Sequence, residues 1–281
     1  MTCQSSVPAR RPRARAVLLV GALVLGLSAC AGGTTTTAAS DASTPGATTS
    51  PSAEPLTGQL RIMAAASLRA SFDELVAEFV ADNPEIDTPV VTYDGSSTLV
   101  MQLVEGAEAE IFASADQATM TKALDADLVP GEAEQFATNT LEIAVAAGNP
   151  AGVTSLADLA SADLQVVLCA PEVPCGAAAA KALTAAGVTV TPVSEEQNVT
   201  AVLTKVAMGE ADAGLVYRTD VLAADGDVEG VEFPEASQAV NSYFIASLQE
   251  TATSPVATAF VEFVLSARGQ EILASHGFSA A

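Results

Sequence analysis

Four short segments of the sequence place hydroxyl or small residues where a β-like run gives way to an amphipathic stretch. They are Ala66-Ser67, Gly95-Ser96-Ser97, Pro174-Cys175-Gly176 and Gln197-Asn198-Val199. The first N–H groups of a helix lack intrahelical partners and carry partial positive charge, so they bind an anion without any charged side chain. Serine is also a common helix cap, and each junction alone favours that simpler interpretation. Only the whole set suggests an anion site.

The elements around these junctions follow an α/β pattern from residue 58 onward, because short β-rich runs alternate with amphipathic stretches. We expect strands at 60–66, 89–93, 110–115, 141–147, 164–170, 188–193, 212–217 and 243–248. We expect helices from 68 to 80, from 99, from 177 to 186 and from 199, and one long helix at 255–273. Ligands of open α/β sheets bind at the carboxyl ends of the strands, where the four junctions would meet.

The first 29 residues have the pattern of an export signal. Four arginines precede an apolar run at 16–27 that is short for a membrane span. Leu27-Ser28-Ala29-Cys30 then resembles the lipobox of bacterial lipoproteins, which predicts cleavage before Cys30 and acylation of that cysteine. An ordinary secretory signal is the alternative. Residues 30–57 are mostly Gly, Thr, Ala, Ser and Pro, a composition that predicts a disordered tether.

The charge balance excludes nucleic acid as a partner. The chain has 11 basic and 34 acidic residues, and loss of the signal would leave 7 basic residues and a net charge of −27. A phosphate backbone needs a basic surface. An anion ligand must therefore be held by fixed dipoles in a water-poor cleft, where hydrogen bonds to a charged group are strong.

Cys169 and Cys175 are the two cysteines that remain beyond Cys3 in the signal and Cys30. A close pair in an exported chain predicts a disulfide, with two free thiols as the alternative. The single histidine, His276, and the lack of a second cysteine pair argue against a protein-bound metal. We interpret His276 as a surface residue.

Several motifs together resemble the periplasmic molybdate-binding proteins of ABC importers. The resemblance covers roughly residues 59 to 280 and rests, in order, on Ala64-Ala65-Ala66-Ser67-Leu68, Gly95-Ser96-Ser97-Thr98-Leu99, Ile111-Phe112-Ala113-Ser114-Ala115-Asp116, Pro171-Glu172-Val173-Pro174-Cys175-Gly176, Gly214-Leu215-Val216-Tyr217-Arg218-Thr219-Asp220 and Gly277-Phe278. It implies the type II periplasmic binding protein fold, in which two α/β lobes enclose a ligand cleft. Lobe one would span 58–140 plus 233–281, and lobe two 141–232.

The resemblance also implies an oxyanion-binding set, which is Ser67, Ser96, Cys175, Val199 and Tyr217. The three hydroxyls would donate to the ligand, and Cys175 and Val199 would donate through backbone N–H groups. Ser97 is an alternative to Ser96. The loop before Cys175 is one residue shorter than in the best-known relatives, which have alanine in place of this cysteine. A disulfide at Cys175 would hold that loop ready for binding.

The function that the resemblance implies is capture of molybdate or tungstate outside the cytoplasm and delivery to an ABC permease. The protein would be a monomer on the outer face of the cell membrane, without a cofactor, with molybdenum present only in the oxyanion. Donors without an acceptor disfavour protonated oxyanions such as hydrogen phosphate. Two alternatives remain, which are a receptor for another tetrahedral oxyanion such as sulfate and a lipid-anchored hydrolase using Ser67, Asp94 and His276. No nucleophile elbow supports the hydrolase, so we expect no enzymatic activity.

Overall fold

The computed structural model describes residues 55–249 and 254–281. The predicted signal peptide, the predicted acylation site Cys30 and most of the predicted tether lie outside these ranges. Within the described ranges, no helix has both the length and the apolar character needed to cross a bilayer.

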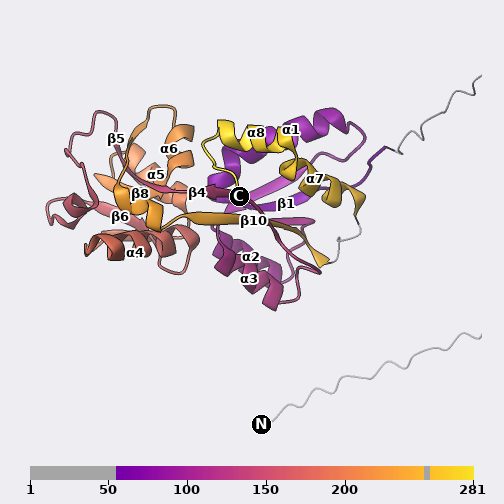
Figure 1. Cartoon of the computed structure of the whole chain (residues 1–281), viewed down its shortest axis with the longest axis horizontal. Helices are drawn as coiled ribbons and strands as arrows, with labels where there is room; N and C mark the ends of the chain where they lie inside the picture. Colours follow the sequence, from indigo (N-terminus) through magenta and orange to yellow (C-terminus); the bar gives the residue numbers. More distant parts are fainter. Residues whose placement is uncertain (1–54, 250–253) are drawn as a thin grey trace, which may run out of the picture. The chain divides into compact units, whose positions relative to one another are not determined.

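The first of two sheets is mixed and has five strands. In spatial order they are β2 (Val90–Asp94), β1 (Arg61–Ala65), β3 (Ile111–Ser114), β10 (Asn241–Ser247) and β4 (Glu134–Asn139). The strands β1, β2 and β3 are parallel, whereas β10 runs antiparallel to both of its neighbours. Figure 1 shows helices on both faces of this sheet, namely α1 (Arg69–Asp82), α7 (Pro255–Leu265) and α8 (Ala267–Ser275) on one and α2 (Ser96–Val104) and α3 (Gln117–Asp125) on the other.

Two apolar layers hold this first lobe together, because alternate residues of each strand face opposite sides of the sheet. Ile111 and Ala113 of β3 join the core that contains the α1 and α7 side chains, while Phe112 joins the core under α2 and α3. Aromatic rings strengthen the first core, since Phe72 and Phe79 both make edge contacts with Phe260. The carboxyl ends of β1, β2 and β3 are thereby set in one place.

The second sheet also has five strands. In spatial order they are β7 (Ser194–Glu196), β6 (Val166–Cys169), β8 (Ala213–Tyr217), β5 (Leu141–Ala146) and β9 (Val228–Val231). The helices of this lobe are α4 (Pro174–Ala186), α5 (Val199–Ala207) and α6 (Arg218–Ala223), with short 3-10 turns η2 (Leu156–Ala160) and η3 (Pro234–Gln238). One continuous core of mostly Val, Leu and Ala lies between sheet and helices.

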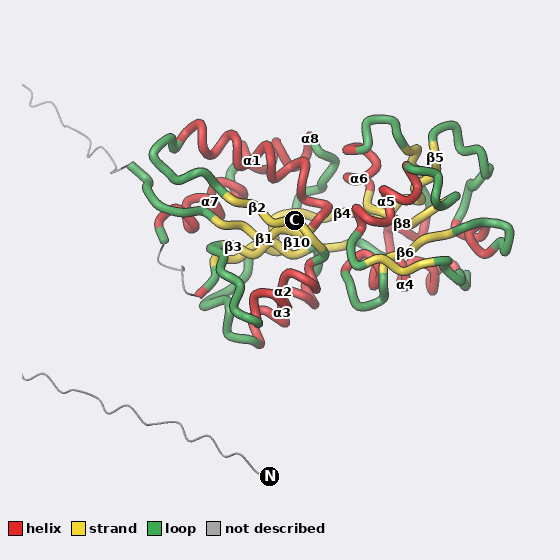
Figure 2. Tube along the Cα trace, turned by 180° about the vertical axis from the view of Figure 1, so that it is seen from behind, coloured by secondary structure: helices red, strands yellow, loops and turns green. Residues whose placement is uncertain are grey.

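The chain passes between the two sheets twice. It leaves the first sheet after Asn139 and enters the second at Leu141, and it returns between β9 and β10. Figure 2 shows β4 and β10 as the elements that run toward the second lobe. This arrangement is the predicted α/β fold with two lobes.

Two predicted elements are wrong. Residues 188–193 are not a strand. Pro192 has no N–H for the ladder, the first backbone bond to β6 comes from Val193 to the carbonyl of Val166, and β7 begins at Ser194. The long helix predicted at 255–273 is two helices that meet at Ser266. The hydroxyl of Ser266 accepts the N–H of Gly269 and caps α8, and a side chain at Gly269 would lie 2.3 Å from the carbonyl oxygen of Phe263.

Candidate functional site

A small cavity lies between the two lobes where the four predicted junctions meet. Its lining residues are Ala65, Ala66, Ser67, Gly95, Ser96, Ala115, Val173, Pro174, Cys175, Gln197, Asn198, Val199 and Tyr217. Its volume is about 20 Å³ for the centre of a water-sized sphere, little more than one water needs. A cavity of this size favours a small ligand over a large organic solute.

Two serines from the first lobe line the cavity. Ser67 lies in the turn η1 (Ala66–Leu68) directly after β1, and its Oγ is 2.8 Å from Oη of Tyr243. Ser96 is the first residue of α2, and its Oγ accepts the N–H of Ala115 at 3.0 Å. That bond leaves the hydroxyl hydrogen of Ser96 free for the cavity.

The alternative serine, Ser97, has a different partner. Its hydroxyl donates to the carbonyl oxygen of Glu172 in the other lobe at 2.8 Å, and Ser97 does not line the cavity. Of the adjacent pair, Ser96 is therefore the one placed to meet a ligand.

The second lobe contributes two helix starts. Helix α4 begins at Pro174 without a side-chain cap, which leaves its first N–H groups, including that of Cys175, without an intrahelical partner. Helix α5 begins at Val199, after Asn198, whose side chain accepts the N–H of Ala201. The N–H groups of Cys175 and Val199 are thus available at the cavity wall.

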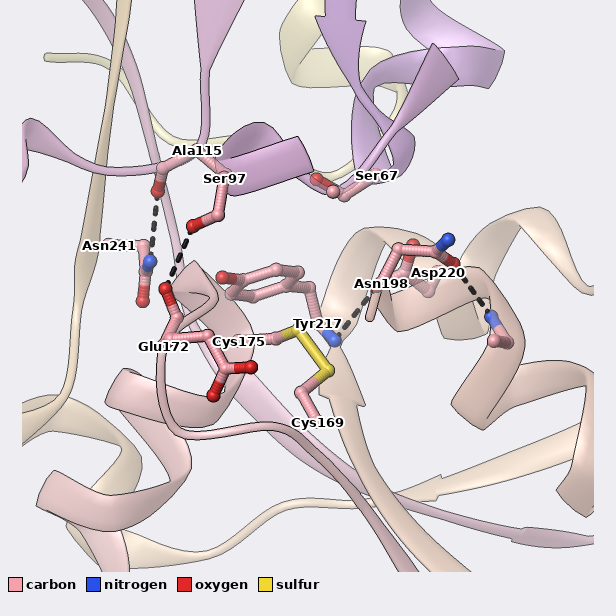
Figure 3. Close-up of a disulfide and its surroundings, with 12 residues drawn as sticks. Ser67, Ser97, Ala115, Cys169, Glu172, Cys175, Asn198, Tyr217, Asp220 and Asn241 are labelled. Carbon is pink, nitrogen blue, oxygen red and sulfur yellow. Dashed lines mark hydrogen bonds between the residues drawn. A yellow bond between two sulfur atoms is a disulfide. The ribbon is translucent and has the colours of Figure 1, made fainter. Parts of the chain in front are cut away.

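The predicted disulfide between Cys169 and Cys175 is confirmed, with a Cα to Cα distance of 5.7 Å. It joins the end of β6 to the first turn of α4, across the loop that carries Glu172. In the view of Figure 3, the bond lies on one side of the Tyr217 ring and Ser67 on the other. The disulfide therefore restrains the loop that positions the Cys175 N–H.

Tyr217 ends β8 and is almost fully buried. Among the described residues, its hydroxyl is the buried side-chain group left without a hydrogen-bond partner. Burial, more than the nearby acidic groups, raises the pKa of Tyr217 well above its ordinary value, so the hydroxyl stays protonated. A buried donor with no partner is costly unless a ligand accepts from it.

Asp220 lies one turn beyond Tyr217 and is also buried. Its Oδ2 accepts the N–H of Tyr217 at 2.9 Å, which holds the tyrosine at the start of α6. Burial raises the pKa of Asp220 to about 7, and the bond from Tyr217 only partly opposes this effect.

The electrostatics of the cavity depend on dipoles. The residues that line it include no Asp, Glu, Lys, Arg or His. The first turns of α2, α4 and α5 meet there, and their unpaired N–H groups supply a positive local field. The site can therefore hold an anion in a protein whose net charge is −23.

Close contacts between the lobes surround the cavity. Nδ2 of Asn198 donates to Oδ1 of Asp94 at 2.8 Å, beside the bond from Ser97 to Glu172. Gly95 approaches the backbone of Gln197 so closely that a Cβ there would lie 2.1 Å from its carbonyl oxygen. The structure is therefore a closed arrangement of the lobes.

The residues considered for a hydrolase have other partners. His276 binds Glu74 of α1 at 2.7 Å, Asp94 accepts from Gly95 and Asn198, and Ser67 contacts Tyr243. His276 is the single histidine of the sequence and contacts Glu74, so Ser67 has no histidine beside it that could act as a base.

Sequence reasoning missed two polar residues beside the site, Tyr243 and Asn139. Both are buried, and Tyr243 contacts Ser67 directly. They lie in β10 and β4, far along the chain from every strand-to-helix junction. The one feature of the sequence that could have indicated Tyr243 was a polar hydroxyl in the middle of an apolar strand.

Comparison with known proteins shows which proteins this chain is similar to. The family model described as bacterial extracellular solute-binding protein matches residues 60–279. The molybdate-binding protein ModA of Mycobacterium tuberculosis is 46% identical over 218 residues, which cover 78% of this chain and 83% of that protein.

Two solved structures share the fold. The periplasmic molybdate-binding protein of Azotobacter vinelandii has a TM-score of 0.67 at 20% identity and covers 79% of this chain and 99% of its own. The sulfate-binding protein SubI of Mycobacterium tuberculosis has a TM-score of 0.69 at 15% identity and covers 80% of this chain and 87% of its own. Proteins named for different oxyanions therefore share this architecture.

Proposed function

The chain belongs to the family of bacterial extracellular solute-binding proteins, and we propose that it captures molybdate outside the cytoplasm and delivers it to an ABC permease. Tungstate, which has nearly the same size and charge, is the second ligand that we propose. The observation that carries this proposal is the small cavity between the lobes, lined by uncharged donors and by the unpartnered hydroxyl of Tyr217. The identity to ModA over most of the chain supports molybdate as the ligand.

The proposed ligand contacts come from both lobes. Ser67, Ser96 and Tyr217 donate hydroxyl groups, and Cys175 and Val199 donate backbone N–H groups. Hydrogen bonds to a charged group contribute about 1.5 to 3 kcal/mol each. About five to seven such bonds support tight binding after the cost of association.

Selectivity follows from two properties of the proposed site. Hydroxyl and N–H donors leave the proton of hydrogen phosphate without an acceptor, which disfavours protonated anions. Sulfate carries no proton at neutral pH, so the cavity must exclude it by size. Sulfate has shorter bonds than molybdate and would reach fewer of the donors at once.

The proposal includes the setting of the domain. Acylation of Cys30 would anchor the mature chain to the outer face of the membrane, and residues 30–57 would serve as its tether. We propose that the protein acts as a monomer and that its lobes are bounded at residues 140 and 233. The closed, loaded form would be the one that engages the permease.

Calorimetry with molybdate, tungstate, sulfate and phosphate tests the proposal. We expect tight binding of molybdate and tungstate, and binding of sulfate and phosphate at least about a hundredfold weaker, a difference of about 2.7 kcal/mol. Equal affinity for sulfate would contradict the assignment and favour a general oxyanion receptor. Turnover of an ester that disappears in Ser67→Ala would favour a hydrolase instead.

A further inference from the structure

Tyr243 lies behind the cavity and contacts two of the residues that line it, Ser67 through its hydroxyl and Tyr217 through its ring. Its ring is fully buried in β10, and its Oη is 2.8 Å from Oγ of Ser67. The rings of Phe136, Tyr217 and Phe278 surround it at centroid distances of 6.2, 6.0 and 5.2 Å. Ser67 lines the cavity, whereas Tyr243 does not. The hydroxyl of Tyr243 is therefore placed to act on a ligand through its hydrogen bond with Ser67.

The direction of the bond between Tyr243 and Ser67 depends on Asn139. Oδ1 of Asn139 accepts the backbone N–H of Thr140 at 2.9 Å, which can only be a donor. The amide is thereby oriented, and its Nδ2 group faces Oγ1 of Thr219 at 2.9 Å and Oη of Tyr243 at 3.4 Å. Because an amide NH₂ only donates, Tyr243 accepts from Asn139, and its own hydrogen is then available to be donated to Ser67.

The bond between Tyr243 and Ser67 determines where the hydroxyl hydrogen of Ser67 can point. When Ser67 accepts from Tyr243, the hydroxyl hydrogen of Ser67 must point elsewhere, and the cavity is what Ser67 faces. We propose that Tyr243, oriented by Asn139, is a positioning residue that fixes Ser67 as a hydrogen-bond donor to the bound oxyanion. This inference rests on the proposed function, since it concerns the same site.

The inference makes a prediction about selectivity. A serine whose hydrogen already points at one ligand oxygen cannot accept a proton from that same oxygen, whereas a serine released from Tyr243 can rotate its hydrogen away and do so. Loss of the Tyr243 hydroxyl should therefore weaken molybdate binding and at the same time improve the relative binding of hydrogen phosphate. If Tyr243 served only in packing, its loss would weaken the binding of molybdate and of hydrogen phosphate by the same factor.

The test measures molybdate and phosphate affinities by calorimetry for the wild type, Tyr243→Phe, Ser67→Ala and the double variant. We expect Tyr243→Phe to bind molybdate about tenfold more weakly and to narrow the ratio of molybdate to phosphate affinity. In the Ser67→Ala background, Tyr243→Phe should change molybdate affinity less than about twofold, because its effect acts through Ser67. Tyr93→Phe is the matched control, since Tyr93 is a half-buried tyrosine that donates to Asp73 and does not line the cavity.

A second variant tests whether Asn139 orients the hydroxyl hydrogen of Tyr243. Asn139→Asp keeps the shape of the side chain but replaces the donor with an acceptor, so Tyr243 would turn its hydrogen away from Ser67. We expect a loss of molybdate affinity similar to that of Tyr243→Phe. Additive effects of Tyr243→Phe and Ser67→Ala, or an unchanged anion ratio, would overturn the inference. Failure of the wild type to bind molybdate would instead contradict the proposed function.

Discussion

Among the described residues, the hydroxyl of Tyr217 is the buried side-chain group without a hydrogen-bond partner. Tyr217→Phe removes a donor to the ligand and also removes this unpaired group. We therefore expect molybdate affinity to fall about tenfold to a hundredfold. The unliganded protein should keep its melting temperature or gain slightly.

Calorimetry and thermal unfolding without ligand check both parts of the Tyr217 prediction. A large loss of unliganded stability would show that the hydroxyl serves the fold more than the ligand. Tyr93→Phe, on the surface of the first lobe, again provides the control.

Asp220 should make stability depend on pH. Its folded pKa is raised to about 7 by burial, while the unfolded chain releases this proton near its ordinary value of 3.8. Between these values the folded state binds more protons, so the contribution of Asp220 is present below about pH 4 and is lost as pH rises through about 7. Asp220→Asn keeps an acceptor for the Tyr217 N–H but does not titrate.

Urea unfolding at pH 5 and pH 8 tests this effect. We expect the wild type to lose on the order of 1 to 4 kcal/mol more than Asp220→Asn over this range. Asp163→Asn, at an exposed position of the same lobe, should follow the wild type. Parallel pH profiles for the wild type and Asp220→Asn would refute the prediction.

At the scale of elements, the turn between β2 and α2 determines how closely the lobes approach. Gly95 has φ −58° and ψ 132°, which alanine adopts without strain, but an added Cβ would lie 2.1 Å from the carbonyl oxygen of Gln197. Gly95→Ala should therefore hold the lobes apart and weaken molybdate binding by more than about tenfold. Stability without ligand should change little, because the clash exists only on closure.

Small-angle scattering with and without molybdate would detect the incomplete closure of Gly95→Ala. Gly131→Ala is the matched control, since a Cβ at that glycine meets nothing within 4 Å. Normal affinity in Gly95→Ala would mean that the binding arrangement of the lobes is more open than this structure.

The disulfide acts on a second element, the loop between β6 and α4. Replacing Cys169 and Cys175 with serine removes a crosslink over a separation of six residues, which should lower the free energy of unfolding by about 2 kcal/mol. Molybdate affinity should also fall, because binding would then have to order the loop that carries the Cys175 N–H. Unfolding and calorimetry on oxidised and reduced wild type provide the comparison, and unchanged affinity would limit the disulfide to stability.

At the scale of the whole molecule, the net charge of −23 repels a dianion at long range, while the short hydrogen bonds act inside a buried cavity. Raising the ionic strength from about 0.01 M to about 0.15 M shortens the Debye length from about 30 Å to about 8 Å. We expect the association rate of molybdate to rise several-fold over this range, with little change in dissociation. A site built on lysine or arginine would show the opposite trend.

Stopped-flow measurement of tyrosine fluorescence follows this association. Glu172→Gln neutralises an exposed carboxylate beside the cavity and keeps the carbonyl that Ser97 binds, so it should reduce the salt dependence. If the association rate of molybdate instead fell as salt was added, a local positive field near the cavity would govern association.

The sequence by itself determined the alternation of strands and helices and the residues that line the cavity. The resemblance of local motifs to those of molybdate-binding proteins implied Ser67, Ser96, Cys175, Val199 and Tyr217, and all five line the cavity. Such motifs can be recognised because a helix start and its neighbours are adjacent in sequence. The predicted alternation omitted β4 and β9, and the order of the strands in the two sheets came only from the structure. The binding role of these five residues stays a prediction that the experiments above test.

Only the tertiary structure decided what depends on contacts between distant segments. It separated Ser96 from Ser97 through a carbonyl in the other lobe, and it brought Tyr243 and Asn139 behind Ser67 from strands 176 and 72 residues farther along the chain. It also ended the last helix at Ser266 and delayed β7 until Ser194. Local periodicity contains no information on which partner a hydroxyl finds across the fold, because that choice depends on packing between segments that are not neighbours in sequence.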